Sequence, residues 1–406
     1  MHDILETIIS VTAWHYGMSW SHAIMILVAL GLMYLALGQK KEPFLLLPLS
    51  FGILLANLPG ANLSAYFTEL TPEQIAEGVK TQGPGLLHFI YKGIQPMQGA
   101  VPLYPPLIFL CIGAITDFSP LIANPRIALI GLGGQLGIFV AFGLYLLAQK
   151  FFLPWCGIEF SGFDFASAAC VGIIGSSDGP TSIYTAAQLN PDLLSAVAIA
   201  AFSYMGLIPF IQPPIMRLLT NAKERVIVMP EPKQVTQRQR ILFPVGLTIV
   251  TLLLVPSAGA LIGMLMLGNI IRECGIVNRY VDTLSNAALN FLTLLLALSI
   301  GSSATADKFL TPQTLLIIVL GLVAFASGTV GGVLVAKLMC HMTGGKVNPL
   351  IGNAGVSAMP MAARISQRLG QEYNHQNHLL MHAMGPIVAS TIGSGIIAGI
   401  FITLLK

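Results

Sequence analysis

The sequence GSSDGPT, residues 175–181, places one carboxylate, Asp178, among helix-breaking glycines and a proline in an otherwise apolar stretch. An ionised side chain at the centre of a membrane helix costs at least about 2.5–3.5 kcal/mol on insertion scales, so it requires a partner or a function. The hydroxyls of Ser177 and Thr181, with carbonyls released by the helix breakers, would supply the oxygen-only ligands that suit an alkali cation. The alternative is that Asp178 only caps a helix beginning near Pro180. Both roles are compatible, and we favour a cation site.

A second broken stretch, NPLIGNAGVSAMPMAARISQRLG, carries polar groups of a different kind. Asn348, Asn353 and Ser357 would add neutral oxygen ligands to a cation site. Arg364, about one turn beyond a proline, would lie at the cytoplasmic mouth of that site, where a guanidinium can bind a carboxylate through two parallel hydrogen bonds. The spacing alone equally permits an interfacial anchor, as we expect for Arg368.

Three other polar residues in apolar surroundings have simpler explanations. Tyr204 lies about midway along a span, and a buried tyrosine more often only finds a carbonyl partner. His382 is expected to pack. Asp117 precedes Arg126 on the same side, which favours an ion pair or a helix cap. Two membrane aspartates also raise the possibility of an intramembrane aspartyl protease, but the G-x-G-D form is absent around Asp178.

The composition is that of a polytopic membrane protein. The chain has 406 residues, of which 55% are hydrophobic and 9% charged, with a mean hydropathy of +0.78; soluble domains carry about 25% charged residues. The five scattered cysteines form no C-x-x-C pair, so we expect reduced, packing thiols. A net charge of +3 gives no reason to expect a nucleic-acid partner. The N-terminal residues lack the pattern of a cleaved leader.

We expect an all-α protein with about ten membrane spans, read from the apolar runs. Two further segments, 163–189 and 349–369, are too interrupted by glycine and proline for continuous spans and too apolar for surface loops. They are typical of re-entrant hairpins. The expected spans are 22–38, 43–58, 102–116, 127–149, 193–219, 241–255, 258–271, 284–301, 313–340 and 378–405.

The distribution of positive charge predicts the orientation. With both termini outside, about 15 of the 20 lysines and arginines fall on the inner side, and the linker 221–240 becomes cytoplasmic. The tryptophans Trp14, Trp20 and Trp155 then lie at the outer interface. An outer loop covers about 59–101, with a short surface helix from Thr71.

The two hairpins also resemble each other in sequence. GSSDGPTSIYTAAQL (175–189) aligns with GVSAMPMAARISQRL (355–369), and other segments of the two halves match in the same order. This predicts two inverted-topology repeats, 1–220 and 241–406, as in secondary transporters whose broken helices meet near the membrane midplane. Chance similarity of two glycine- and proline-rich stretches is the alternative.

Several long motifs together resemble one family. GAITDFSPLIANPR, GIIGSSDGPTSIY, FSYMGLIPFIQPPIM and NPLIGNAGVSAMPMAARISQRLG followed by LLMHAMGP are similar to the beta subunits of sodium-translocating, biotin-dependent decarboxylases, such as oxaloacetate decarboxylase. The resemblance runs collinearly from about Gln39 to the C-terminus. It implies a membrane subunit that decarboxylates carboxybiotin, consumes an outside proton and exports Na⁺. The residues on which the family's functional positions fall are Asp178, Tyr204, Asn348, Gly352, Ser357 and Arg364.

The resemblance leads to a specific hypothesis. Asp178, Asn348, Gly352 and Ser357 bind Na⁺, with Ser177, Thr181 and Asn353 as further candidate ligands, while Arg364 orients carboxybiotin from the cytoplasm. Tyr204 and the sodium-free Asp178 relay the proton, since a low dielectric favours a protonated carboxyl group. Ile387 stands where oxaloacetate-type sequences have an asparagine, and the outer loop is shorter. The acyl substrate therefore stays open among oxaloacetate, methylmalonyl-CoA, glutaconyl-CoA and malonate.

The implied complex supplies what this chain lacks. No MKM biotin-attachment motif occurs, so biotin would belong to a carboxyltransferase alpha subunit. The resemblance also implies a small gamma or delta membrane subunit, a homo-oligomer of beta subunits and the bilayer of a bacterial inner membrane. From the composition and repeats alone, a free-standing cation/proton antiporter or sodium-coupled carboxylate symporter fits equally well.

Overall fold

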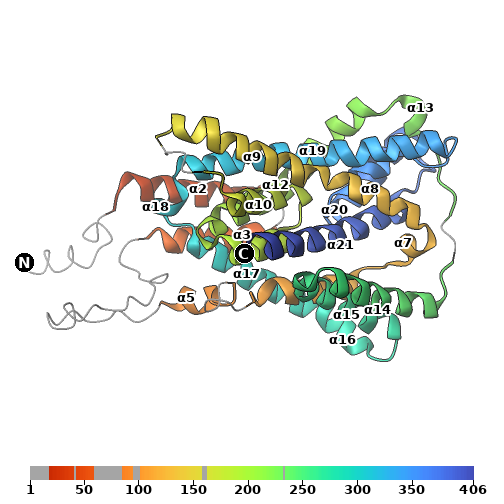
Figure 1. Cartoon of the computed structure of the whole chain (residues 1–406), viewed down its shortest axis with the longest axis horizontal. Coiled ribbons are helices and arrows are strands. Elements are labelled where there is room, and N and C mark those ends of the chain that lie inside the picture. Colours follow the sequence, from red (N-terminus) through yellow and green to blue (C-terminus); the bar gives the residue numbers. More distant parts are fainter. Residues whose placement is uncertain (1–17, 41–42, 59–84, 95–100, 158–161, 232–233) are drawn as a thin grey trace, which may run out of the picture. The chain divides into compact units, whose positions relative to one another are not determined.

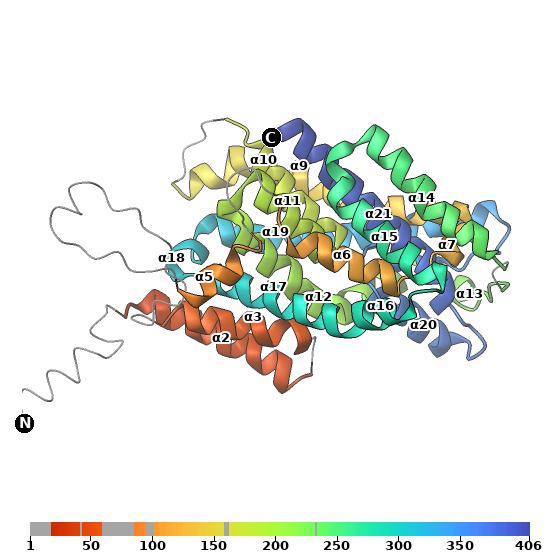
Figure 2. The same ribbon diagram turned by 90° about the horizontal axis from the view of Figure 1, so that it is seen from below.

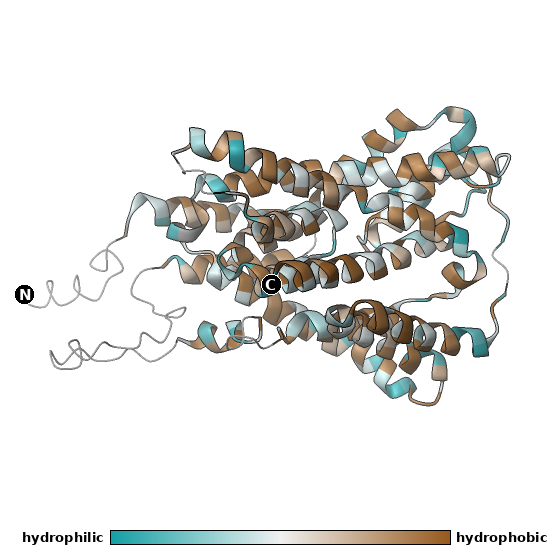
Figure 3. Cartoon of the chain, in the orientation of Figure 1, coloured by the Kyte–Doolittle hydropathy of each residue, from teal (hydrophilic) through white to brown (hydrophobic). Residues whose placement is uncertain are grey.

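The computed structural model describes residues 18–40, 43–58, 85–94, 101–157, 162–231 and 234–406. Within these ranges every regular element is a helix, and brown, apolar stretches run along the longer ones in Figure 3. The predicted all-α polytopic membrane class is confirmed. Trp14, the surface helix expected from Thr71 and most of the predicted outer loop lie outside the described residues.

Contacts divide the chain into two units. The first unit contains residues 1–104 and 290–311, and α3 and α17 pack closely in it. A side chain at Gly52 would come within 2.6 Å of the Leu298 carbonyl, and the Asn57 amide donates to Ala304 O at 2.8 Å. Its helices are α2 (Trp20–Leu37), α3 (Pro43–Ala56), α5 (Leu86–Tyr91), most of α17 (Leu289–Ser303) and α18 (Ala306–Phe309).

The second unit contains residues 105–289 and 312–406 and holds both broken stretches. In Figure 1, α9 and α19 run side by side, as their contacts require. Its long helices are α6 (Tyr104–Ile115), α9 (Leu136–Trp155), α12 (Leu194–Leu219), α14 (Gln237–Leu254), α15 (Gly259–Cys274), α19 (Pro312–Met342) and α21 (Leu380–Leu405). Shorter ones are α7 (Ser119–Ala123), α8 (Ala128–Gly134), α13 (Ala222–Arg225) and α16 (Asn278–Asp282), with a π-helix over Thr283–Ala288 and 3₁₀ turns at Pro125–Ile127, Pro191–Leu193 and Pro256–Ala258.

Local sequence explains where the helices of this unit begin and end. Thr236 caps α14 with Gln239 completing a capping box, and Gly275 ends α15 in the left-handed conformation. Figures 1 and 2 both show α14 and α15 side by side, joined by the turn at Pro256. The two apolar runs expected at 241–255 and 258–271 therefore form a helix pair.

Five of the described helices or helix pairs are long and apolar enough to cross a membrane: Trp20–Leu37, Pro125–Trp155, Asn278–Ser303, Pro312–Met342 and Leu380–Leu405. A sixth is the bent pair formed by Pro191–Tyr204 and Gly206–Leu219, with an angle of 58°. Pro43–Ala56, Tyr104–Ile115 and Phe165–Ser176 are apolar but shorter. The expected number of about ten spans stays a prediction, as do the inverted orientation of the halves and the placement of the termini.

Both predicted breaks are present in the second unit. The first hairpin consists of α10 (Phe165–Gly172), the 3₁₀ turn η2 (Ile173–Ser176) and α11 (Gly179–Leu189). The second consists of the 3₁₀ segment η6 (Pro349–Gly355) and α20 (Met361–Tyr373). Glycine and proline at the predicted positions thus interrupt the helices and leave extended residues between the two arms.

Glycines allow the surrounding helices to reach these breaks. A Cβ on Gly134, at the end of α8, would lie 1.8 Å from the Gly355 carbonyl oxygen, and one on Gly332 of α19 would lie 2.2 Å from the Gly352 oxygen. Both distances are impossible for a side chain. Backbone therefore packs directly on backbone where α8 and α19 contact the second hairpin.

Candidate functional site

The first hairpin turns at Ser177, which adopts the left-handed conformation with φ of 58°. This conformation is uncommon outside glycine, and it reverses the chain between η2 and α11. Asp178 follows in an extended conformation and caps α11, with Pro180 in the first turn. The capping role expected as an alternative is therefore confirmed, and the question becomes what else this carboxylate contacts.

Asp178 is buried and receives three hydrogen bonds from neutral donors. Thr181 donates its backbone N–H to Oδ1 at 3.4 Å and its hydroxyl to Oδ2 at 2.7 Å. The Ser394 hydroxyl from α21 donates to Oδ2 at 2.9 Å. No cationic side chain of the described part of the chain pairs with Asp178. A buried carboxylate with only neutral donors is an electrostatically incomplete site, which a cation would complete.

The second hairpin meets the first through its extended residues. Ser357 donates its backbone N–H to Ser176 O at 2.8 Å and its hydroxyl to Ser390 Oγ at 2.9 Å. Gln135, between α8 and α9, donates to the same Ser390 Oγ at 2.8 Å. The two hairpins are therefore in direct contact, and a shared ion site of Asp178 and Ser357 stays a prediction.

Helix α21 connects the two halves of a polar group, the Asp178 cluster, which consists of Asp178, Thr181, Ser394, Ser357, Ser390 and Gln135. Ser394 contacts Asp178, while Ser390, four residues earlier on the same helix face, contacts Ser357. The sequence analysis did not single out Ser390, Ser394 or Gln135. A signal was present, because two serines four apart form a polar stripe in an apolar helix.

Two oxygen atoms near the cluster have no hydrogen-bond partner among the residues the structure describes. These are Ser177 Oγ and Gln135 Oε1, and both are buried. An unsatisfied buried polar atom costs about 1–3 kcal/mol. Like the Asp178 carboxylate and the Thr181 and Ser357 hydroxyls, they are hard oxygen donors, the type of ligand that suits an alkali ion.

The amides expected as further ligands are engaged elsewhere. Asn348 donates to Ile227 O at 2.8 Å and to Arg225 O at 3.2 Å, which fastens the 225–227 segment to the second hairpin. Asn353 donates to Gln212 Oε1 at 3.0 Å and to Ala362 O at 2.9 Å.

Gly352 is placed for packing. A Cβ there would lie 2.4 Å from Val333 Cα in α19. The second hairpin is thus supported by the packing of Gly352 and by the hydrogen bonds of Asn348 and Asn353. No hydrogen bond joins either asparagine side chain to Asp178.

Tyr204 lies at the 58° bend of α12. It is buried, and its hydroxyl has no hydrogen-bond partner within the described residues. A Cβ on Gly321 would lie 2.5 Å from the Tyr204 ring and 3.3 Å from Ile174 of the first hairpin. Tyr204 is therefore packed near that hairpin, although no hydrogen bond joins it to Asp178.

Arg364 is exposed on the first turn of α20. It borders an open pocket of about 440 Å³ together with Gln367, Arg368 and Glu372. In the described parts of the chain its guanidinium makes no ion pair. It is accessible to a ligand from outside the protein and is not part of the Asp178 cluster.

The remaining two polar residues have structural positions. Asp117 accepts the Ser119 N–H at 2.8 Å just before α7, whose N-cap residue is Phe118, and within the described residues it forms no ion pair with Arg126. His382 is buried, as a packing residue would be, and it also borders a cavity at the start of α21.

Comparison with known proteins decides the family. Residues 21–405 match the family described as Na⁺-transporting oxaloacetate decarboxylase beta subunit. The chain belongs to this family. The match covers both hairpins, α21 and every member of the Asp178 cluster.

Individual relatives of this beta-subunit family differ in the acyl substrate that their names give. The chain is 47% identical to the methylmalonyl-CoA decarboxylase subunit beta of Propionigenium modestum over 96% of both chains. It is 46% identical to the glutaconyl-CoA decarboxylase subunit beta of Acidaminococcus fermentans, over 95% of this chain and 94% of that one. It is 44% identical to the probable oxaloacetate decarboxylase beta chain of Vibrio cholerae over 99% of both. Similar identity to all three means that overall similarity does not select an acyl substrate.

Proposed function

We propose that the protein is the membrane subunit of a sodium pump, which decarboxylates carboxybiotin and couples this reaction to Na⁺ export. The observation that carries the proposal is the buried Asp178 carboxylate, surrounded by hydroxyl groups and without a cationic partner in the described residues, in a chain of the beta-subunit family. Na⁺ is the cargo of this site, and the carboxylated biotin is the substrate.

The site would bind Na⁺ through oxygen atoms of both hairpins. Asp178 supplies the charge, Ser177, Thr181 and Ser357 supply hydroxyl oxygens, and Ser394 keeps the carboxylate in position through its 2.9 Å hydrogen bond. Asn348, Gly352 and Asn353 support the hairpin that carries Ser357.

Coupling follows from competition for one carboxylate. Loss of CO₂ from carboxybiotin leaves a biotin anion that takes up a proton. When Na⁺ leaves Asp178, a proton replaces it, because a buried carboxylate without a cation favours its neutral form. Tyr204, with its buried hydroxyl near the first hairpin, is the second candidate in this proton relay. One site that alternates between Na⁺ and H⁺ ties decarboxylation to export.

The arginine on α20 has the geometry for the substrate rather than for the ion. Arg364 is exposed and borders an open pocket at the predicted cytoplasmic end. We assign it the orientation of the carboxylate of carboxybiotin through paired hydrogen bonds. The biotin is delivered by a carboxyltransferase alpha subunit in a complex that includes a small gamma or delta subunit and several beta subunits, in a bacterial inner membrane.

The decisive experiment compares two aspartates that cap the two arms of one hairpin. Asp178 caps α11, and Asp164, which is exposed, caps α10 by accepting the Ser167 N–H at 2.9 Å. Decarboxylation by the assembled complex is measured against Na⁺ concentration for Asp178→Asn and Asp164→Asn. We expect Asp178→Asn to lose sodium-stimulated turnover and Asp164→Asn to keep it. Retained stimulation in Asp178→Asn would refute the assignment of the ion site.

A free-standing secondary transporter is the second candidate, since broken helices of two halves around a buried carboxylate also suit an antiporter. Co-purification separates the two. A decarboxylase subunit is retained on avidin resin through a biotin-carrying partner, whereas a free-standing transporter is not. Absence from the avidin eluate, with Na⁺/H⁺ exchange by the chain alone in vesicles, would favour the transporter.

A further inference from the structure

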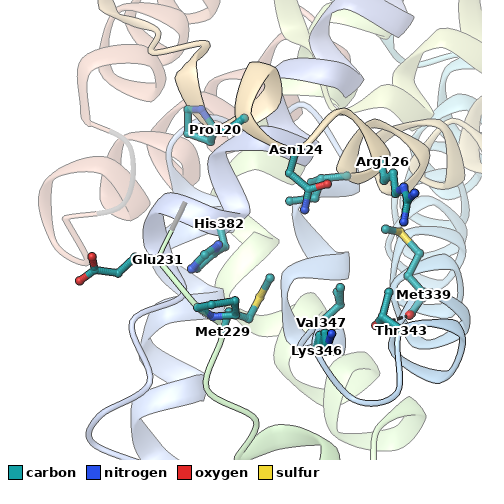
Figure 4. Close-up of a pocket in the computed structure, with 13 residues that line it drawn as sticks. Pro120, Asn124, Arg126, Met229, Glu231, Met339, Thr343, Lys346, Val347 and His382 are labelled. Carbon is teal, nitrogen blue, oxygen red and sulfur yellow. Dashed lines mark hydrogen bonds between the residues drawn. The ribbon is translucent and has the colours of Figure 1, made fainter. Parts of the chain in front are cut away.

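A cavity of about 490 Å³ lies apart from the Asp178 cluster, within the second unit. Four segments form its walls: α7 and the turn after it, the 229–231 stretch of the linker, the C-terminal end of α19 with the following loop, and the start of α21 (Figure 4). The linker residues place it at the predicted cytoplasmic end. Its volume falls within the range of about 300–1,000 Å³ that small-molecule sites occupy.

The charged groups of this cavity are unbalanced. Arg126 and Lys346 both border it, and neither has an ion pair or a side-chain hydrogen bond among the described residues. Among the described residues of the lining, Glu231 is the only acidic one, and in Figure 4 its carboxylate points away from the other labelled side chains. The cavity therefore presents a net positive charge to a ligand.

The rest of the lining is suited to a compact ring with polar edges. Figure 4 shows the Asn124 amide between Arg126 and His382. An amide both donates and accepts hydrogen bonds, as a cyclic urea does. Met229 and Met339 give the wall polarizable, adaptable apolar surface.

We infer that this cavity is a docking site for a carboxylated cyclic urea, the head group of carboxybiotin, in which Arg126 and Lys346 bind the carboxylate and Asn124 contacts the ureido group. The inference rests on the proposed function and adds to it the place where the substrate first binds. The loop that ends in Lys346 and Val347 leads directly into the second hairpin at Asn348. A ligand in the cavity would therefore contact the chain just before the hairpin that carries Ser357.

The test measures turnover of a biotin-carrier domain, carboxylated in advance, by the assembled complex. Arg126→Ala and Lys346→Ala are compared with Arg279→Ala, whose side chain is exposed on the same predicted side and outside the cavity. Loss of one exposed cation should raise KM about fivefold, and loss of both about 20-fold, with kcat and the Na⁺ midpoint unchanged. Arg126→Lys, which keeps the charge, should have a KM close to that of the wild type. High salt should raise the KM of the wild type and of Arg126→Lys, but not that of the variant that lacks both cations.

The outcomes separate this inference from the proposed function. If the wild-type complex turns over the carrier and both alanine variants keep its KM, the cavity is not the docking site, while the proposed function stands. A wild-type complex that does not turn over the carrier refutes both. Vesicles of anionic lipid are also added, and the change that they cause in the thermal unfolding midpoint is measured. If the alanine variants keep the wild-type KM and differ only in this change of midpoint, the cations bind lipid phosphate and the docking inference is overturned.

Discussion

At the scale of single residues, the site depends on how one carboxylate is held. Asp178 has an intrahelical partner in Thr181 and one long-range partner, Ser394, 216 residues later in the chain. The first contact is sufficient to cap a helix. The second fixes the carboxylate against α21 and sets the direction in which its other oxygen atom is available.

Removing the long-range donor should weaken sodium binding without unfolding the protein. In Ser394→Ala, Asp178 loses one hydrogen bond to a charged group, worth about 1.5 kcal/mol, so the Na⁺ concentration for half-maximal decarboxylation should rise about tenfold. Ser327→Ala is the matched control, because that hydroxyl is bonded only to a carbonyl of its own helix. An unchanged midpoint in Ser394→Ala would show that Ser394 does not position the carboxylate.

Arg364 should affect the chemical step in a different way. Lysine keeps the charge but cannot form two parallel hydrogen bonds with a carboxylate. We expect Arg364→Lys to lower kcat for carboxybiotin about tenfold while the sodium midpoint stays constant, and Arg368→Lys, on the same helix, to have little effect. Equal kcat values for Arg364→Lys and the wild type would leave Arg364 as an interfacial anchor.

At the scale of elements, the hairpins are held by backbone contact. α8 and α19 approach the second hairpin through glycines at distances where a Cβ cannot fit. Asn353, in η6, is hydrogen-bonded to Gln212 and Ala362, so it ties this hairpin to α12 and joins its two arms. The proposed ion site is therefore built on a tightly packed support, and the support explains why polar residues outside the Asp178 cluster occur in these segments.

A single methyl group tests that support. Gly332→Ala should lower the thermal unfolding midpoint of the purified protein, since overpacking typically costs about 1–3 kcal/mol and the new Cβ would meet the Gly352 carbonyl. Gly143→Ala is the control, because nothing lies within 4 Å of its Cβ position. Equal midpoints for the two variants would contradict direct backbone packing at Gly332.

At the scale of the whole molecule, the arrangement of the chain in the membrane is the main prediction. The charge asymmetry predicts that the 221–240 linker is cytoplasmic and that both termini lie outside. This orientation determines which side supplies the proton and which side offers the cavity of Arg126 and Lys346 to a soluble partner. The coupling scheme therefore depends on it.

Single cysteines would establish the orientation. In a background with the five native cysteines replaced, Lys223→Cys and Lys406→Cys are treated with a membrane-impermeant maleimide in vesicles of known orientation. Both positions are exposed. We expect residue 406 to react in right-side-out vesicles and residue 223 only in inside-out vesicles. Reaction of both cysteines from the same side would require an even number of spans between residues 223 and 406. The predicted topology has an odd number there, so this result would contradict it.

The sequence by itself determined the class of the protein and the location of its breaks. Composition and apolar runs predicted helices in a membrane, and glycine and proline predicted the interruptions within 163–189 and 349–369, because these residues act through local backbone geometry. The cap at Asp178 also followed from local pattern. Sequence motifs predicted the family of the protein, and the comparison with known proteins confirmed it.

The tertiary structure alone decided which polar groups share a site. Asp178 meets Ser394, and Ser357 and Gln135 both meet Ser390, whereas Asn348 and Asn353 turn to the linker and to α12. All of these residues were equally plausible ligands by type. Their partners lie many residues away along the chain, and a side chain's direction there is set by how helices pack rather than by its neighbours in sequence. Long-range packing, which local propensity does not encode, therefore separates the residues of the proposed ion site from those that support the hairpin.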